Sequence, residues 1–177
     1  MQGAEQVREP VDSNEPYGDE PAQPHNLEAE RGVLGGILAD PVNQFDKVAG
    51  IVAREDFFRP DHRLIFEAIE ALCLAGKVVD PVTVMDLMNR SGKPVPHGGL
   101  TYLRRLGERR DNTGSLAGWA QIVRDNSQRR QVITACVATI NKVRAGMGKT
   151  ISELTAELEG KLQLIGDVGQ SSEETLG

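Results

Sequence analysis

Apolar positions repeat at helical spacing through most of the chain. Between residues 27 and 39, and again between 64 and 73, apolar side chains recur three or four residues apart, as on one face of an α-helix. Similar patterns follow Asp80 and Thr150, and the longest runs from residue 115 to about 145. No alternation of apolar and polar residues is long enough to predict a β-strand. The pattern therefore predicts an all-α fold.

Capping residues mark where several of these helices begin. Asp40 and Asp80 are each followed by a proline, which fits an N-cap residue and the first helical position. Thr150 and Glu153 have the spacing of a capping box, in which each side chain bonds to the backbone amide of the other residue. We therefore expect helices to begin directly after Asp40, Asp80 and Thr150.

The last part of the folded region has the pattern of a long helix and a hairpin. Residues 124–131 contain no apolar side chain, so the long pattern is either one helix with a solvated middle or two helices with a break. A short loop at 146–150 joins it to the final helix, which predicts an antiparallel hairpin over about residues 132–166. We accordingly divide the folded region into a compact helical head, residues 25–114, and a long helix with the hairpin, residues 115–166.

Charge separates the ends of the chain from its middle. The formal net charge is -6, yet residues 1–24 hold six acidic residues and one arginine, and residues 167–177 hold three acids and no base. The residues between them therefore carry a slight positive charge. Residues 1–24 also contain four prolines and few large apolar groups, so we expect a disordered acidic tail. Residues 167–177 are interpreted as a second disordered tail or the start of a linker to a further domain.

Composition excludes several classes of protein. No apolar run approaches the ~20 residues of a membrane-spanning helix. The acidic N-terminus resembles neither a secretory signal nor a transit peptide. Cys73 and Cys136 lie far apart in apolar surroundings, which is typical of reduced core cysteines rather than a disulfide framework. We expect a cytoplasmic protein that does not bind membranes.

No group of residues has the spacing of a catalytic or metal site. The histidines of the chain are His25, His62 and His97. None has a second histidine or a cysteine at helical spacing, so surface or capping roles are expected. The segment from Gly146 to Thr150 ends like a phosphate-binding loop, but the first glycine of that motif is replaced by Val143 and a helix precedes it. The chain should therefore have no catalytic residue, metal ligand or cofactor of its own.

Arginines gather in two places along the chain. The first cluster comprises Arg104, Arg105, Arg109 and Arg110, and the second comprises Arg124, Arg129 and Arg130. Both could contact the phosphates of nucleic acid. Acidic residues interrupt both clusters, so solvated helix faces or a protein interface are the preferred interpretation. A DNA-binding module that uses the arginines is the alternative.

Five short motifs follow one another along the folded region. They are PHNLEAERGVLGGIL at 24–38, DFFRPDHRLIFEAI at 56–69, GKVVDPVTV at 76–84, GGLTYL at 98–103 and WAQIVR at 119–124, with the dipeptide NT at 112–113 between the last two. Together they resemble the N-terminal domain of DnaB-family replicative DNA helicases, over about residues 24–166. The sequence departs from the family at Gln128 and Arg129, where apolar residues are usual, and it lacks the family's C-terminal motor domain.

The resemblance implies a helical head and a hairpin that form the collar of a hexameric ring, arranged as a trimer of dimers. The hairpin would be the dimerising element, and the residues expected to contribute to self-association are Ile133, Val137, Ile140, Leu154, Leu158 and Ile165. We expect most of them to be covered within the hairpin itself, with some surface left for a partner hairpin.

The resemblance also implies partners. These are further copies of the chain, a DnaG-type primase, a helicase loader, and DNA through the full-length ring. ATP and magnesium would belong to the absent motor domain, so this chain would not itself be an enzyme although the full-length protein would be an ATP-dependent helicase. A stand-alone modulator that captures primase or helicase is a further alternative, and a reading frame ending at Gly177 would favour it.

Overall fold

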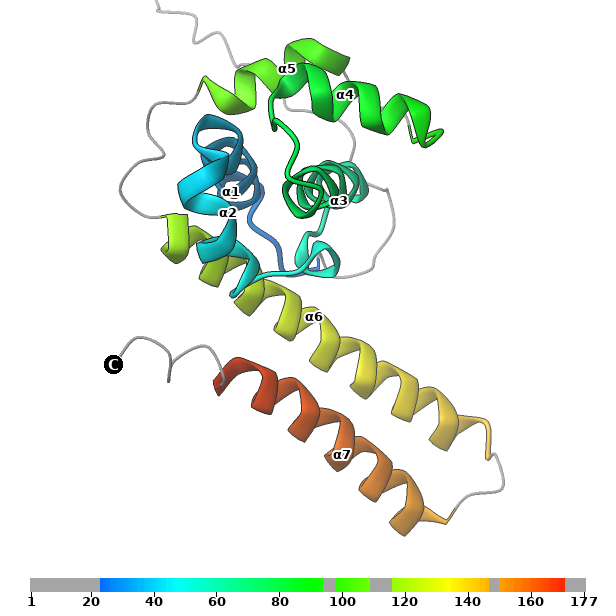
Figure 1. Cartoon of the computed structure of the whole chain (residues 1–177). Helices are drawn as coiled ribbons and strands as arrows, with labels where there is room; N and C mark the ends of the chain where they lie inside the picture. The colour runs from blue at the N-terminus through cyan, green and yellow to red at the C-terminus, as the bar shows by residue number, and fades with distance from the viewer. Residues whose placement is uncertain (1–22, 94–97, 109–115, 147–149, 171–177) are drawn as a thin grey trace, which may run out of the picture.

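The computed structural model describes residues 23–93, 98–108, 116–146 and 150–170. Its elements are α1 (Leu27–Ala39), α2 (Pro41–Ala49), the 3-10 turn η1 (Arg54–Asp56), α3 (Pro60–Leu74), α4 (Pro81–Arg90), α5 (Gly99–Gly107), α6 (Leu116–Arg144) and α7 (Ile151–Gln170). Every regular element in these ranges is a helix, which confirms the predicted all-α fold. Figure 1 shows a head built from α1 to α5, with α6 running beneath it and projecting outward beside α7.

The predicted helix starts are confirmed by their hydrogen bonds. Asp40 accepts from the amide of Asn43 at 3.4 Å, and Asp80 accepts from the amides of Val82 and Thr83 at 2.7 and 2.9 Å. The capping box before α7 is also present. The backbone amide of Thr150 donates to the Glu153 carboxylate at 2.7 Å, and the backbone amide of Glu153 donates to the Thr150 hydroxyl at 3.3 Å.

The core of the head lies where α1 and α3 meet the other helices. From α1 the side chains of Val33, Leu34 and Ile37 are fully buried, and from α3 those of Ile65, Phe66 and Ile69 are fully buried. Burial of a side chain of this size contributes about 1.5 to 3 kcal/mol to folding. The partly buried aromatic side chains of Tyr102 and Trp119 pack against this core. The head therefore buries the apolar residues of α1 and α3 that recur at helical spacing in the sequence.

The first half of α6 packs closely on α1 because two glycines leave room for it. A Cβ atom on Gly32 would lie 2.2 Å from a ring carbon of Trp119, and one on Gly36 would lie 2.5 Å from a methyl carbon of Leu116. Both distances are far shorter than van der Waals contact, so a larger residue at either position would displace α6. The glycines of the first motif thus determine how the long helix crosses the head.

The polar stretch 124–131 does not break α6, since the helix is continuous over 29 residues. Ser127 and Arg130 are buried, and Arg124 is largely covered, because this part of α6 lies against the head. The alternative of a break is therefore wrong and the single helix is confirmed, with Asp125, Arg129 and Gln131 exposed in the stretch. The predicted boundary between head and long helix falls among residues 109–115, which lie outside the described ranges, so that division stays a prediction.

Candidate interaction surface

The hairpin is formed by the outer half of α6 and by α7, which runs antiparallel to it (Figure 1). Lys142 makes an ion pair with Glu157, and the amide of the Gln128 side chain donates to the carbonyl of Ile165 at 3.1 Å. Ala135 is buried midway between these two contacts. Gln128, Ala135 and Lys142 are spaced seven residues apart, so they form the side of α6 that faces α7.

A different side of α6 carries exposed aliphatic residues. Ile133, Val137 and Ile140 are 41%, 48% and 47% exposed. Ile133 and Ile140 each precede a residue of the α7-facing side by two positions, which turns them about 200° around the helix from it. Val132 and Val143 are also exposed. We call the set Val132, Ile133, Val137, Ile140 and Val143 the outer face of α6.

The outer face changes one expectation from the sequence. Leu154 of α7 is only 5% exposed, and Leu158 and Ile165 are half-buried, so these three are covered at least in part within the chain. Ile133, Val137 and Ile140 point away from α7, and the expectation that most of the apolar stripe is covered within the hairpin is wrong for them. A contiguous exposed aliphatic surface of this kind marks an interaction site in many proteins.

The second arginine cluster joins α6 to the head. Arg124 makes an ion pair with Asp56 of η1 at 2.9 Å. Arg130 donates to the carbonyls of Pro24 and Asp56 at 2.8 and 2.5 Å, and its guanidinium lies over the ring of Phe58. Burial lowers the pKa of Arg130, and the positive charge of Arg63 lowers it further although nearby acids oppose the shift. Two of the three clustered arginines are therefore structural contacts rather than free cations.

The first arginine cluster is only partly described. Arg104 and Arg105 are exposed on α5. Arg109 and Arg110 lie outside the described residues, so the clustering of all four side chains stays a prediction. The alternative of a DNA-binding module stays a prediction that now depends on the first cluster and on Arg129, which is exposed on α6.

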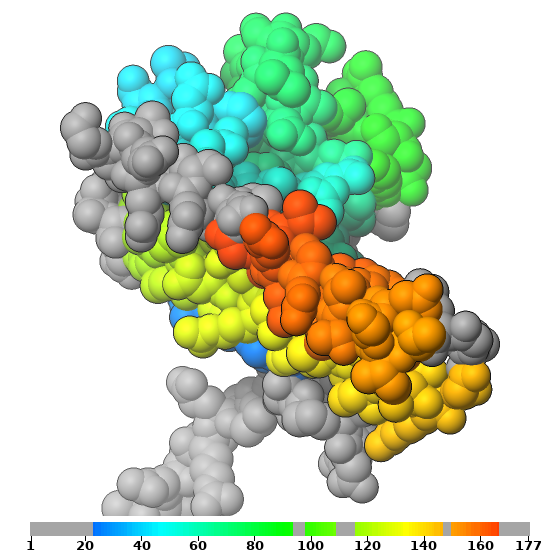
Figure 2. All heavy atoms as spheres, turned by 90° about the horizontal axis from the view of Figure 1, so that it is seen from below, coloured from blue at the N-terminus to red at the C-terminus, as the bar shows by residue number. Residues whose placement is uncertain are grey.

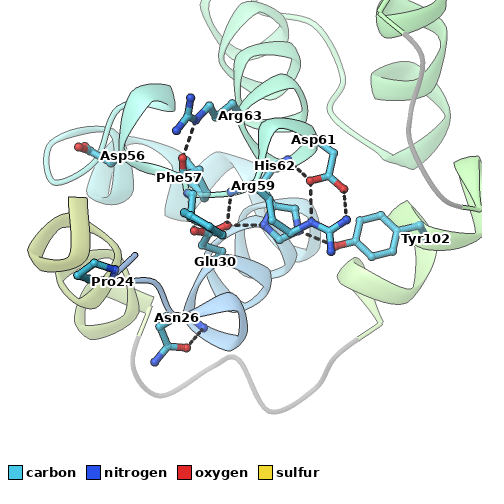
Figure 3. Close-up of polar contacts among 12 residues, drawn as sticks. Pro24, Asn26, Glu30, Asp56, Phe57, Arg59, Asp61, His62, Arg63 and Tyr102 are labelled. Atoms are coloured by element: carbon cyan, nitrogen blue, oxygen red, sulfur yellow. Dashed lines mark hydrogen bonds and ion pairs between the residues drawn. The ribbon is translucent and has the colours of Figure 1, made fainter. Parts of the chain in front are cut away.

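A buried polar network ties together α1, α3 and α5, and sequence reasoning missed it. The Glu30 carboxylate accepts from the amides of Phe58 and Arg59 at 2.6 and 3.4 Å. His62 lies between Glu30 and Tyr102, with its Nδ1 2.6 Å from the carboxylate and its Nε2 2.7 Å from the hydroxyl (Figure 3). Burial raises the pKa of Tyr102. The expected surface or capping role of His62 is wrong, because its side chain is completely buried.

This network is suited to holding helices together. His62 is fully buried and Glu30 is 2% exposed at its side chain, so a substrate has no access to either. The Asp61 carboxylate accepts hydrogen bonds from the Arg59 guanidinium at 2.8 and 2.7 Å, and Asp61 is buried as well (Figure 3). Among the described residues, no three histidine, cysteine, aspartate or glutamate side chains converge as a metal site requires. Within the same ranges, no helix is long and apolar enough to cross a membrane.

A pocket of about 740 Å³ lies where the hairpin meets the head. The C-terminal end of α7 reaches the head there, as the red-orange spheres of Figure 2 show. Its lining includes Gln23, Phe58, Arg63, Arg130, Ala138 and Leu164. Glu55 and Lys161 also line it, so the pocket combines three cationic side chains and one carboxylate with a wall of aromatic and aliphatic carbon. Sequence reasoning did not predict it, since its lining comes from four separate segments.

Comparison with known proteins places these features in a family. The family profile described as "DnaB-like helicase N terminal domain" matches residues 22–125. The replicative DNA helicase DnaB of Pasteurella multocida is 29% identical over 151 residues, which cover 85% of this chain and 32% of that protein. The DnaB of Buchnera aphidicola subsp. Baizongia pistaciae is 31% identical over 144 residues, covering 81% and 31%. The chain spans about a third of the length of these relatives.

Solved structures agree with the sequence comparison. The N-terminal domain of DnaB helicase from Mycobacterium tuberculosis has a TM-score of 0.73 at 27% identity, covering 80% of this chain and 99% of that one. A DnaB-like replicative helicase studied for its interactions with primase has a TM-score of 0.61 at 28% identity, covering 77% and 31%. The helical head, the long α6 and the five motifs therefore have one explanation: the chain belongs to the family of DnaB-like helicase N-terminal domains.

Proposed function

We propose that this domain is the collar of a replicative DNA helicase in the cytoplasm, where it assembles copies of the chain into a ring and docks primase. The outer face of α6 is the observation that carries the proposal. Val137 and Ile140 are about half exposed on a projecting hairpin, on the side that α7 leaves free. Pairing of two such faces would remove this apolar surface from water, which is the main driving force of protein association.

The hairpin itself gives a second reason to expect self-association. Of the α7 side chains that the structure describes, only Leu154 is buried. A pair of helices with so little covered surface gains little stability from its own packing, since tertiary contacts supply most helical stability. A second hairpin on the outer face would supply the missing contacts. The trimer of dimers in a hexamer, which the family resemblance implied, is the arrangement that we propose.

Primase docking is supported by the likeness to the DnaB-like helicase whose interactions with primase have been described. We propose that the assembled collar, rather than the isolated chain, presents the docking surface. In this proposal ATP and magnesium serve a motor domain of the kind found in full-length helicases, and a loader and DNA contact the complete ring. Titration of the chain with a purified DnaG-type primase, followed by calorimetry, tests the docking step directly.

Light scattering over a dilution series tests self-association. The variant Val137→Asp places a carboxylate at the centre of the outer face, and an unpaired buried charge should raise the dissociation constant by at least about 30-fold, equivalent to about 2 kcal/mol. Val42→Asp is the matched control, because Val42 is 87% exposed on α2 of the head. A wild-type chain that stays monomeric at high concentration, or equal weakening by both variants, would refute the proposal.

A further inference from the structure

The contact between α6 and the head changes character after Val123. Up to that point Leu116, Ala120 and Val123 are buried as part of the apolar core of the head. Residues 124–131 contain no apolar side chain, and the next buried apolar residue of α6 is Ala135, on the side that faces α7. The stretch of α6 between the core and the hairpin therefore has only polar side chains with which to contact the head.

Two arginines of this stretch make those contacts. The Arg124 guanidinium donates to both carboxylate oxygens of Asp56 at 2.9 Å. Asp56 is itself held in place, because its carboxylate also accepts from the backbone amide of Ala53 at 2.9 Å. Arg130 donates from one nitrogen to the carbonyl of Pro24 at 2.8 Å and from another to the carbonyl of Asp56 at 2.5 Å. Both arginines thus bind the end of η1, and Arg130 also binds the segment that leads into α1.

The Arg130 contact specifies geometry more than it stabilises the fold. Burial removes this guanidinium from water and lowers its pKa, and the carboxylates of Glu30 and Asp56 offset only part of that shift. Because desolvation opposes the attraction in this way, buried charged contacts give little net stability. A guanidinium does, however, present its donors in a fixed planar arrangement. Bonds to two carbonyls from separate segments therefore restrict the direction of α6.

Beyond Arg130 the long helix acts as a lever. It continues for fourteen residues to Arg144, which is about 21 Å at the rise of an α-helix (Figure 1). Packed helices cross at angles that vary by about 15 to 20° around their preferred values. A change of about 15° would move the tip of the hairpin by about 5 Å. The pocket between the end of α7 and the head leaves space for such a movement.

We propose that Arg124 and Arg130 are positioning residues, which fix the angle between hairpin and head and thereby select the assembly that the outer face builds. The angle is a property of one chain. The selection rests on the proposed function, because copies close into a ring only if the rotation from one to the next is fixed. Without the two arginines, dimers still form through the outer face, but further assembly gives a mixture of sizes.

Pulsed electron resonance between two spin labels measures the angle. The labels replace Val42 of the head and Ile151 at the start of α7, which are 87% and 70% exposed. Cys73 and Cys136 are first changed to alanine, so that only the two new cysteines react. Labelled chain is diluted into unlabelled chain, which restricts the measured distances to pairs within one chain. The wild-type sequence should give one narrow distribution of distances.

The arginine variants should broaden that distribution. We expect Arg124→Gln and Arg130→Gln each to widen it at least about twofold, as the unrestrained crossing angle of α6 becomes variable. Arg129→Gln is the matched control, because it makes the same change at an exposed arginine of the same helical turn. The control should leave the width unchanged. Equal widths in the wild-type chain and in both arginine variants, or equal broadening by the control, would overturn the proposal.

A second variant pair keeps the test valid if Arg130→Gln fails to fold. Asp56→Asn removes the charge that Arg124 binds but keeps the carbonyl that Arg130 binds. Asp56→Asn and Arg124→Gln should broaden the distribution equally, and their combination should broaden it no further, because both remove one interaction. Additive broadening would contradict the assignment of Asp56 as the partner. Near-ultraviolet circular dichroism of Trp119 shows whether the head of each variant is folded.

Analytical ultracentrifugation of the same variants tests the selection of the assembly. Arg124→Gln and Arg130→Gln leave the outer face intact, so the dissociation constant of the dimer should stay within about twofold of the wild-type value. The single largest species of the wild-type chain should be replaced by a range of sizes. Broadened distances with an unchanged largest species would refute the selection. A wild-type chain that stays monomeric would refute the selection together with the proposed function, and the result for the angle would stand.

Discussion

The head and the hairpin are built from similar helices but differ in what covers their apolar residues. In the head, Val33, Ile37, Ile65 and Ile69 are completely buried by neighbouring helices of the same chain. In the hairpin, Ile133, Val137 and Ile140 have similar side chains and spacing but stay about half exposed. The head thus has a core of its own, although Val42, Leu74 and Val78 stay exposed on it, whereas the hairpin has a helix face that none of the described residues covers.

Polar groups show the same contrast. The head buries the polar side chains of Glu30 and His62. Their burial is tolerated because each makes hydrogen bonds inside the head. In the hairpin the polar contacts are exposed or half-exposed, as in the pair of Lys142 and Glu157. Such pairs contribute little to stability. The buried polar contacts therefore stabilise the head, and the first half of α6 packs directly on it.

Removing the buried carboxylate should have the largest effect. Glu30→Ala leaves the amides of Phe58 and Arg59 and the ring of His62 without their acceptor. We expect the free energy of unfolding to fall by about 3 to 5 kcal/mol in urea denaturation. Glu28→Ala is the control on the exposed side of the same helical turn, with an expected cost of about 1 kcal/mol or less. Equal costs would show that the network does not stabilise the head.

The same glycine-to-alanine change should have opposite effects in the two regions. At Gly32 the added methyl group would meet the ring of Trp119, and overpacking of this kind costs about 1 to 3 kcal/mol. At Gly160 in α7 nothing lies within 4 Å of the added atom. There alanine should stabilise the helix by up to about 1 kcal/mol. Thermal unfolding of both variants measures the difference, and a loss of stability at Gly160 would indicate that its surface is already covered.

The smallest effect expected is a dependence on acidic pH. Burial of Asp61 acts to raise its pKa, but the hydrogen bond and charge of Arg59 together with His62 leave it below the usual 3.8. Asp61 therefore stabilises the head above pH 3.8, and this contribution is lost as the pH falls through the lower, folded-state value. Asp61→Asn should flatten the acid side of the stability curve by about 1 kcal/mol or less. An unchanged curve would contradict this assignment.

Much of the fold could be predicted because it depends on local signals. The N-caps Asp40 and Asp80 can be recognised from the residues that directly follow them. The apolar spacing of α1 and α3 can likewise be recognised from one or two helical turns of sequence. The buried network could not be assigned, because Glu30 also fits the first turn of a helix and its partner lies 32 residues away. One signal was present: Glu30 and His62 each share a helix face with core residues three and four positions later. A polar residue on such a face indicates a buried contact.

The outer face shows a different limit of sequence reasoning. Apolar spacing identified Ile133, Val137 and Ile140, but it could not tell whether α7 or another molecule covers them. That depends on which side of α6 the neighbouring helix occupies. Here α7 lies on the opposite side, where Gln128 and Lys142 contact it. The pocket depends on long-range packing in the same way.

Scanning calorimetry at a series of protein concentrations tests the central claim most directly. If the hairpin is completed by a second copy, the midpoint of unfolding must rise with concentration, because association stabilises the folded chain by mass action. The variant Ile140→Asp should lose this dependence while keeping the wild-type midpoint at high dilution. A wild-type midpoint that does not change over a hundredfold range of concentration would contradict the account.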